Sequence, residues 1–210
     1  GFESGLGDWY AESGTWQVGV PTSGPGGAYA GTNCAATVLA TNYASGIDSR
    51  LISPPFVVPP RSTNPGLRFR HWFRFADQYC PFNCDEGSFG YVEIKSDNQD
   101  WQSVSPTYAG QSGGWTFPFI DLKPFAGQRI QVAFRAHSAT YVEAGWYIDD
   151  VRIVHDFALL MGSTIIRTQD TACVSLSIGA GTPPLTANVL LRIPAGSLSN
   201  LTFNPTACWS

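Results

Sequence analysis

Charged residues are scarce in this 210-residue chain, and the basic ones are almost all arginine. Asp, Glu, Lys and Arg together make up 13% of the sequence, against roughly 25% in ordinary globular domains. Ten of the 12 basic residues are Arg, no run rich in Lys or Arg occurs, and the net charge is -4. General nucleic-acid binding, which depends on clustered positive charge, is therefore not expected.

Long hydrophobic runs and amphipathic helical stretches are missing as well. No apolar run approaches the ~20 residues that a membrane-spanning helix needs. The chain carries no signal peptide and begins with Gly rather than Met. We therefore expect a processed secreted fragment or a trimmed piece of a longer protein, located outside the cell or at its surface.

Glycine, proline and aromatic residues are plentiful, with 22 Gly, 15 Pro and 13% aromatics. This composition is typical of short strands joined by many turns. The segment 67–75 alternates strictly, which puts Leu67, Phe69, His71, Phe73 and Phe75 on one face of a strand and leaves its Arg residues and Trp72 on the other.

Two further segments repeat the alternation. Val92 and Ile94 are expected to point inward from 90–95, as are Ile130, Val132 and Phe134 from 129–135. Short alternating strands separated by Gly/Pro turns predict an all-β fold, an antiparallel jelly-roll β-sandwich over residues 1–155. After about residue 156 aromatics thin out, and 156–210 is expected to be a short β-rich segment forming a small or partial second sandwich.

Five cysteines leave an odd count. Cys80 and Cys84 flank one loop, Cys173 and Cys208 bracket the C-terminal segment, and Cys34 is left over. Disulfides within these two pairs are the expected arrangement, although the connectivity cannot be deduced from sequence. A zinc site is the rival interpretation, and the three His residues show no matching ligand spacing.

A set of aromatic, acidic and strand-forming motifs occurs in a fixed order along the first ~155 residues. In sequence order they are Phe2-Glu3, Trp9, Trp16, Ala28-Tyr29-Ala30-Gly31, Tyr43, Ser49 to Pro54, Leu67 to Phe75, Gly90 to Ile94, Trp115, Ile120-Asp121-Leu122, Ile130 to Phe134 and Gly145 to Ile153. With these features, the first ~155 residues resemble a MAM domain and the related jelly-roll carbohydrate-binding modules. The resemblance is closest to the bacterial versions attached to secreted peptidases and polysaccharide-degrading enzymes, and the cysteines depart from the animal pattern. The C-terminal segment faintly resembles the opening strands of a cohesin-like, immunoglobulin-type sandwich.

Carboxylates occur at both ends of the first domain, at Glu3 and at Asp149-Asp150. If the first and last strands lie together, these groups can meet on one calcium ion, which takes six to eight oxygen ligands. The resemblance also implies a structural calcium held by a Glu of the first strand and an Asp of the last. The alternative is that loop amides or Arg side chains satisfy these acids.

A sugar-binding surface is the main candidate for function. Trp72 shares a strand face with Arg68, Arg70 and Arg74, and guanidinium groups suit the carboxylates or sulfates of acidic glycans. Arg135 is a further candidate for this basic stripe, and Trp101 and Tyr108, in or near a loop region, offer further aromatic rings. The alternatives are that Trp72 is a packing residue and that the Arg residues pair with Glu93 and neighbouring acids.

Catalysis has little support. The segment Gly110-Gln111-Ser112-Gly113-Gly114 matches the G-x-S-x-G pattern of serine hydrolases, but it lacks the strand-to-helix elbow that the pattern requires. We expect a non-catalytic extracellular module that binds carbohydrate. Two alternatives remain open: an adhesive or structural component that binds protein partners or associates through an exposed edge strand, and an accessory domain of a secreted peptidase.

Overall fold

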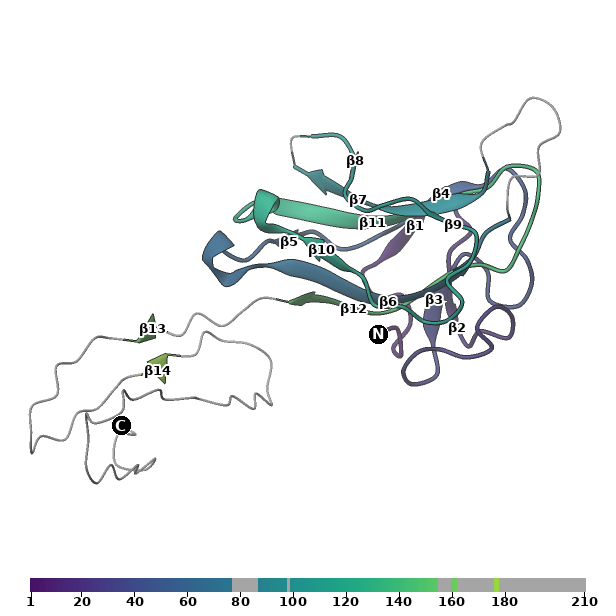
Figure 1. Ribbon diagram of the computed structural model, residues 1–210, viewed down its shortest axis with the longest axis horizontal. Helices are drawn as coiled ribbons and strands as arrows, with labels where there is room; N and C mark the ends of the chain where they lie inside the picture. Colours follow the sequence, from purple (N-terminus) through teal and green to yellow (C-terminus); the bar gives the residue numbers. More distant parts are fainter. Residues whose placement is uncertain (77–86, 98, 155–159, 162–175, 178–210) are drawn as a thin grey trace, which may run out of the picture. The chain divides into compact units, whose positions relative to one another are not determined.

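The computed structural model describes residues 1–76, 87–97, 99–154, 160–161 and 176–177, and the regular secondary structure within these ranges is almost entirely β-strand (Figure 1). The chain divides into two compact units, Gly1–Asp156 and Phe157–Ser210. The all-β, antiparallel fold expected from the sequence is confirmed. Within the described ranges, no helix has the length and apolar character needed to cross a membrane.

The first unit contains two antiparallel sheets. The seven-stranded sheet runs in the order β1-β4-β11-β7-β8, with β5 added beside β11 and β9 beside β7. The bounds of its strands are β1 (Tyr10–Glu12), β4 (Asp48–Ile52), β5 (Phe56–Val57), β7 (Phe89–Ser96), β8 (Gln102–Ser103), β9 (Tyr108–Ala109) and β11 (Arg129–His137).

The five-stranded sheet runs in the order β10-β6-β12-β3-β2. Its long central pair, β6 and β12, is antiparallel, with Trp72 opposite Tyr147 and Arg70 opposite Asp149. The bounds are β2 (Gln17–Gly19), β3 (Cys34–Ala36), β6 (Gly66–Arg74), β10 (Phe119–Asp121) and β12 (Gly145–Val154); two short 3-10 helices are η1 (Arg61–Thr63) and η2 (Lys123–Phe125).

The core lies between the two sheets and is built by the predicted alternation. The predicted inward residues of β6, β7 and β11 are all buried, and Trp146 on β12 is fully enclosed among them. Phe134 and Phe69 pack edge to face with ring centroids 4.9 Å apart. The alternation works because neighbouring side chains of a strand point to opposite faces of the sheet, and only one face of each sheet meets the other.

The opening segment differs from its prediction. It forms turns rather than a strand beside β12, because Gly5 takes a left-handed φ of 90° and its N–H returns to the Phe2 carbonyl. Phe2 is nevertheless buried in the core, and Gly1 lies against the Asp149 carboxylate. The two ends of the domain therefore meet, but through turns and not through paired strands.

In the second unit, β13 (Leu160–Met161) pairs antiparallel with β14 (Leu176–Ser177). Most of the short β-rich segment expected over 156–210 lies outside the described residues, and so do four of the five cysteines. The pairings Cys80–Cys84 and Cys173–Cys208 thus remain predictions. Cys34 is a free, fully buried thiol.

Candidate functional site

The outer face of the five-stranded sheet carries the side chains of β6 that point away from the core. Arg68, Arg70 and Trp72 are half-buried and Arg74 is exposed, whereas their neighbours Phe69 and His71 are buried. The two faces of this strand are therefore those that the sequence predicts.

Aromatic rings from other segments interleave with two of these guanidinium groups. The Arg70 guanidinium carbon lies 4.2 Å from the Tyr29 ring centroid and 3.9 Å from that of Phe117. Arg68 lies 4.9 Å from Phe117 and 5.1 Å from Phe119. We call Tyr29, Arg70, Phe117, Arg68 and Phe119 the Arg-aromatic face. Its outermost rings, Tyr29 and Phe119, are 42% and 49% exposed.

The other Arg residues nearby are neutralised by acids. Arg74 Nε lies 3.1 Å from Glu143 Oε2, and Arg152, whose guanidinium carbon is 5.8 Å from the Phe117 ring, forms an ion pair with Asp150. In the part of the chain that the structure describes, the side chains of Arg68 and Arg70 form neither an ion pair nor a hydrogen bond.

Trp72 lies beside this face but is largely a packing residue. Its ring contacts the buried Tyr147 edge to face at 5.4 Å, and both belong to a small apolar cluster on the outer side of the sheet that includes Cys34. Trp115 joins the same cluster and meets Tyr29 edge to face. The aromatic rings that reach solvent here are those of Tyr29 and Phe119, which the sequence interpretation did not select.

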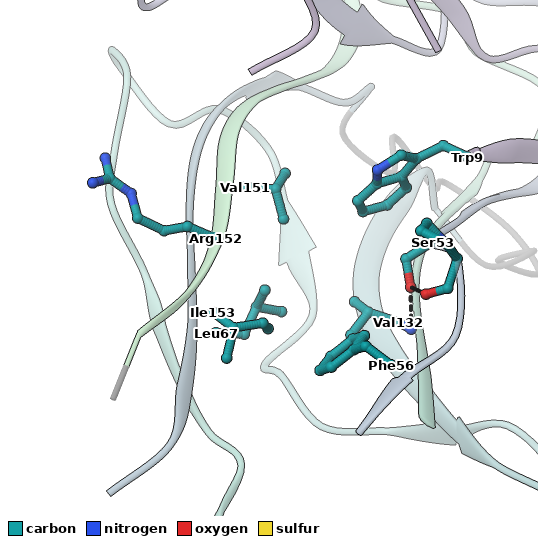
Figure 2. A pocket seen from close by; sticks show the side chains of 9 residues that line it. Trp9, Ser53, Phe56, Leu67, Val132, Val151, Arg152 and Ile153 are labelled. Carbon is teal, nitrogen blue, oxygen red and sulfur yellow. Dashed lines mark hydrogen bonds between the residues drawn. The ribbon is translucent and has the colours of Figure 1, made fainter. Parts of the chain in front are cut away.

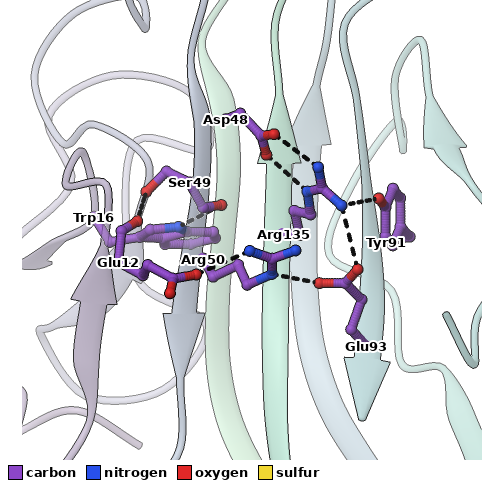
Figure 3. Close-up of polar contacts among 8 residues, drawn as sticks. All are labelled: Glu12, Trp16, Asp48, Ser49, Arg50, Tyr91, Glu93 and Arg135. Carbon is purple, nitrogen blue, oxygen red and sulfur yellow. Dashed lines mark hydrogen bonds and ion pairs between the residues drawn. The ribbon is translucent and has the colours of Figure 1, made fainter. Parts of the chain in front are cut away.

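Arg135 belongs to the other sheet, so its assignment to the β6 stripe is wrong. On the outer face of the seven-stranded sheet, it donates to both oxygens of Asp48, at 2.7 Å each, and to Tyr91 Oη at 2.7 Å (Figure 3). These contacts raise the pKa of Arg135 and lower the pKa of Asp48.

Glu93 completes this network and is therefore not a partner of the β6 arginines. Its side chain is almost fully buried and accepts from Arg50 Nε at 2.6 Å, while Arg50 Nη1 also donates to Glu12 at 2.8 Å (Figure 3). Alternating charges on neighbouring strands thus neutralise one another across this sheet.

Trp101 and Tyr108 do not join Trp72. Trp101 lies 5.6 Å from the Arg50 guanidinium and 6.0 Å from Lys95 Nζ, on the seven-stranded sheet. Tyr108 packs its ring against His71 at 4.6 Å and Trp146 at 5.6 Å, inside the sandwich, and burial raises the pKa of its hydroxyl.

Ser112 of the G-x-S-x-G match and the buried His71 both form structural hydrogen bonds. Ser112, the central residue of the G-x-S-x-G match, accepts a hydrogen bond at its Oγ from the Phe73 N–H of β6 at 3.1 Å. His71 accepts at Nδ1 from the Trp146 indole N–H at 3.2 Å, and burial lowers the pKa of His71 to about 4.

Glu3 and Asp149 converge on one loop, Ala30–Asn33. The N–H groups of Thr32 and Asn33 donate to the Glu3 carboxylate at 3.1 and 3.0 Å, and the Ala30 N–H donates to Asp149 Oδ2 at 3.0 Å. Between them, Gly31 has φ +67°, and a Cβ there would overlap the Glu3 carboxylate. The loop amides thus cap both acids, which was the alternative to calcium.

The charges of these two acids also act on Cys34. Burial, together with Asp149 and Glu3, raises the pKa of the Cys34 thiol to about 12. Asp149 is fully buried, whereas Asp150 pairs with Arg152. Of the two aspartates, Asp149 is therefore the one placed with Glu3. Among the described residues, no group of three or more His, Cys, Asp and Glu side chains is gathered as a metal site.

An apolar pocket of about 150 Å³ opens between the sheets at one edge (Figure 2). The Ser53 hydroxyl in the pocket wall already has two hydrogen-bond partners within the protein. It donates to the Pro54 carbonyl and accepts from the Val132 N–H, at 2.9 Å each. The pocket offers few groups that could orient a polar ligand. Its lining residues are Trp9, Ser53, Pro54, Phe56, Leu67, Val132, Val151, Arg152 and Ile153.

Comparison of the sequence with known proteins finds a relative, which matches part of this chain. No protein-family model matches the chain. The chain is 36% identical over 155 residues to Bacillopeptidase F of Bacillus subtilis (strain 168), a match that covers 71% of this chain and 10% of that protein. The chain thus corresponds to a small part of that relative.

Among solved structures, TmCBM61 in complex with β-1,4-galactotriose has a TM-score of 0.50 at 16% identity, covering 74% of this chain and 94% of that one. The K3 cleaved adhesin domain of Lys-gingipain from Porphyromonas gingivalis w83 has a TM-score of 0.47 at 20% identity, covering 73% and 95%. The match to TmCBM61 shows that the chain shares the β-sandwich fold of that carbohydrate-binding module.

Proposed function

We propose that the Gly1–Asp156 unit is a non-catalytic carbohydrate-binding module of an extracellular protein, of the bacterial MAM-like type. The observation that carries the proposal is the Arg-aromatic face, where exposed rings alternate with guanidinium groups that have no acid partner. Sharing a fold with TmCBM61, which was solved with β-1,4-galactotriose, adds support.

The chemistry of the face suits a sugar chain. Sugar rings present apolar C–H faces to aromatic rings and hydroxyls to planar donors. Tyr29 and Phe119 leave ring surface open to solvent, while Arg68 and Arg70 supply donors between them. The rings are held in place by their contacts with the guanidinium groups, so little side-chain freedom remains to be lost on binding.

The proposal is tested by affinity electrophoresis of the full chain through a panel of neutral and acidic polysaccharides. Tyr29→Ala and Phe119→Ala should each weaken retardation several-fold, because each removes a stacking surface worth about 1 kcal/mol. Tyr10→Ala is the matched control, since Tyr10 is 48% exposed but lies on the seven-stranded sheet. Lack of binding to every polysaccharide, or equal weakening by Tyr10→Ala, would contradict the proposal.

We also propose that a structural calcium ion ties the opening turn to β12. Glu3 and Asp149 are the charged ligands that fit, because both point at the Ala30–Asn33 loop, and backbone carbonyls would supply further oxygens. Bound there, the ion would neutralise two neighbouring carboxylates. Asp150 is left out of this set because Arg152 already neutralises it.

A second candidate role is that of an accessory domain of a secreted peptidase. The 36% identity with part of Bacillopeptidase F favours it. A module that holds protein for a peptidase should bind a denatured protein such as gelatin and ignore the polysaccharide panel, so the same electrophoresis with gelatin in the gel separates the two roles. Retardation by polysaccharide alone would exclude the protein-holding role.

A further inference from the structure

The Arg-aromatic face carries positive charge that the protein leaves unneutralised. The chain as a whole has a net charge of -4, and the flanking Arg74 and Arg152 are each paired with an acid. Asp149 lies opposite Arg70 in the strand register, but its carboxylate accepts from the N–H groups of Ala30 and Asp150. Two guanidinium charges, those of Arg68 and Arg70, therefore remain on this face.

Packing around Arg70 leaves one edge of its guanidinium available. Its Nε is buried and has no hydrogen-bond partner. Neither of its two terminal nitrogens is buried in this way among the described residues. Since Tyr29 and Phe117 lie against the group, a ligand reaches it along its edge. An approach along the edge of a guanidinium is the geometry in which it donates two parallel hydrogen bonds to a carboxylate or a sulfate.

Arg68 repeats this arrangement two residues away on the same strand. Phe117 lies against both guanidinium groups, and Phe119 lies against Arg68. Residues two apart on a strand are about 7 Å apart on one face. The shared Phe117 ring thus holds two cationic donors side by side. Neither guanidinium group has to break an ion pair before it can bind a ligand.

We infer that this face selects glycans that carry anionic groups, with Arg70 and Arg68 binding the carboxylates of uronic acids or the sulfates of sulfated sugars, and with Tyr29 and Phe119 contacting the sugar rings. The inference rests on the proposed carbohydrate binding and adds its specificity. Neutral chains can use only the outer rings and single hydrogen bonds, and they leave two positive charges without a counter-charge.

The test measures binding of the full chain by titration calorimetry to two matched pairs of polymers. Polygalacturonic acid is compared with the same polymer after its carboxyl groups have been reduced to alcohols, and dextran sulfate is compared with dextran. The acidic member of at least one pair should bind about ten-fold or more tightly than its neutral partner, and added salt should weaken that binding. The pair that shows the difference identifies carboxylate or sulfate as the recognised group.

Three variants locate the effect. Arg70→Gln and Arg68→Gln should each weaken binding of the acidic polymer about ten-fold while leaving the melting temperature within a few degrees. Arg129→Gln is the control, because it removes the same charge from an exposed position on the seven-stranded sheet. It should change binding less than two-fold.

The possible results distinguish a failure of the anionic specificity from a failure of carbohydrate binding. Equal binding of neutral and acidic partners would overturn the anionic specificity and leave carbohydrate binding standing. Loss of affinity in Arg129→Gln as large as in Arg70→Gln would mean that net charge alone attracts the polymer, which also overturns the inference. If no polymer of either pair binds and the neutral panel fails as well, carbohydrate binding itself is wrong.

Discussion

His71 shows what the inter-sheet core requires of an ionisable side chain. It is 2% exposed, surrounded by Phe69, Phe73 and Tyr108, and its Nδ1 accepts the Trp146 indole hydrogen. A proton on Nδ1 would remove that acceptor and place a charge among aromatic rings. The neutral form is therefore required in the folded state, and burial lowers the pKa of His71 to about 4.

This residue should make the domain less stable as the pH falls. Because the pKa is about 4 when folded and about 6.5 when unfolded, the unfolded state takes up the proton first. Stability is thus fully present above pH 6.5 and declines as the pH falls toward 4, by about 2 kcal/mol at pH 5. Urea unfolding of the full chain at pH 7.5, 6 and 5 measures the loss.

The variant His137→Gln provides the control, since His137 is half-buried at the end of β11 and stacks on Phe89. It should keep the decline between pH 7.5 and 5. Asp48, whose pKa is lowered by Arg135, contributes only below the ordinary pKa of an aspartate, so it does not disturb this window. An unfolding midpoint that stays constant from pH 7.5 to 5 in the parent chain would contradict the account of His71.

At the scale of elements, the positions of side chains on strands could be predicted from the sequence, whereas those of side chains on loops could not. The alternation along 67–75 was enough to assign both faces of β6, because a strand fixes the direction of each side chain. Tyr29 and Phe117 come from connecting segments, whose course the pattern does not determine. The dense aromatic run Trp115-Thr116-Phe117-Pro118-Phe119 was the signal that could have indicated this second component of the face.

Sequence reasoning also paired groups that the fold separates. Arg135 and Arg70 have the same alternating context, but β11 and β6 belong to different sheets. Tyr108 follows a turn-rich stretch, yet β9 brings its ring into the core beside Trp146. Both errors concern long-range packing, which local periodicity does not encode.

The Ala30–Asn33 loop is the element on which the calcium proposal can be tested. If Glu3 and Asp149 hold an ion there, a chelator should lower the melting temperature by several degrees, and excess calcium should restore it, since an ion that binds only the folded state stabilises it by mass action. Glu3→Gln keeps the size of the side chain and should remove most of this response. Differential scanning calorimetry with and without chelator gives the result.

Glu12→Gln serves as the matched control for the loss of one carboxylate. Glu12 pairs with Arg50 on the seven-stranded sheet, so this variant should keep the full response to calcium. If chelator leaves the parent chain unchanged and elemental analysis finds no bound calcium, the hydrogen bonds from three loop N–H groups to Glu3 and Asp149 hold the loop without an ion.

At the scale of the first unit, the two outer faces of the sandwich differ in how their central arginines are held. On the seven-stranded sheet, Arg50 and Arg135 are saturated by Glu12, Glu93 and Asp48. On the five-stranded sheet, Arg68 and Arg70 are held by aromatic rings and keep their charge. Neutralised charges contribute to stability and offer little to a ligand, so we propose that the ligand binds to the five-stranded sheet.

The most direct test is to map the binding surface by nuclear magnetic resonance of the nitrogen-15-labelled full chain during titration with polygalacturonic acid oligomers. The side-chain Nε–H signals of Arg68 and Arg70 and the backbone signals of Tyr29, Phe117 and Phe119 should shift progressively and saturate. The indole signal of Trp101 and the Nε–H signals of Arg50 and Arg135 report on the opposite face and should stay in place. Shifts confined to that second group would contradict the central claim that the Arg-aromatic face is the binding site.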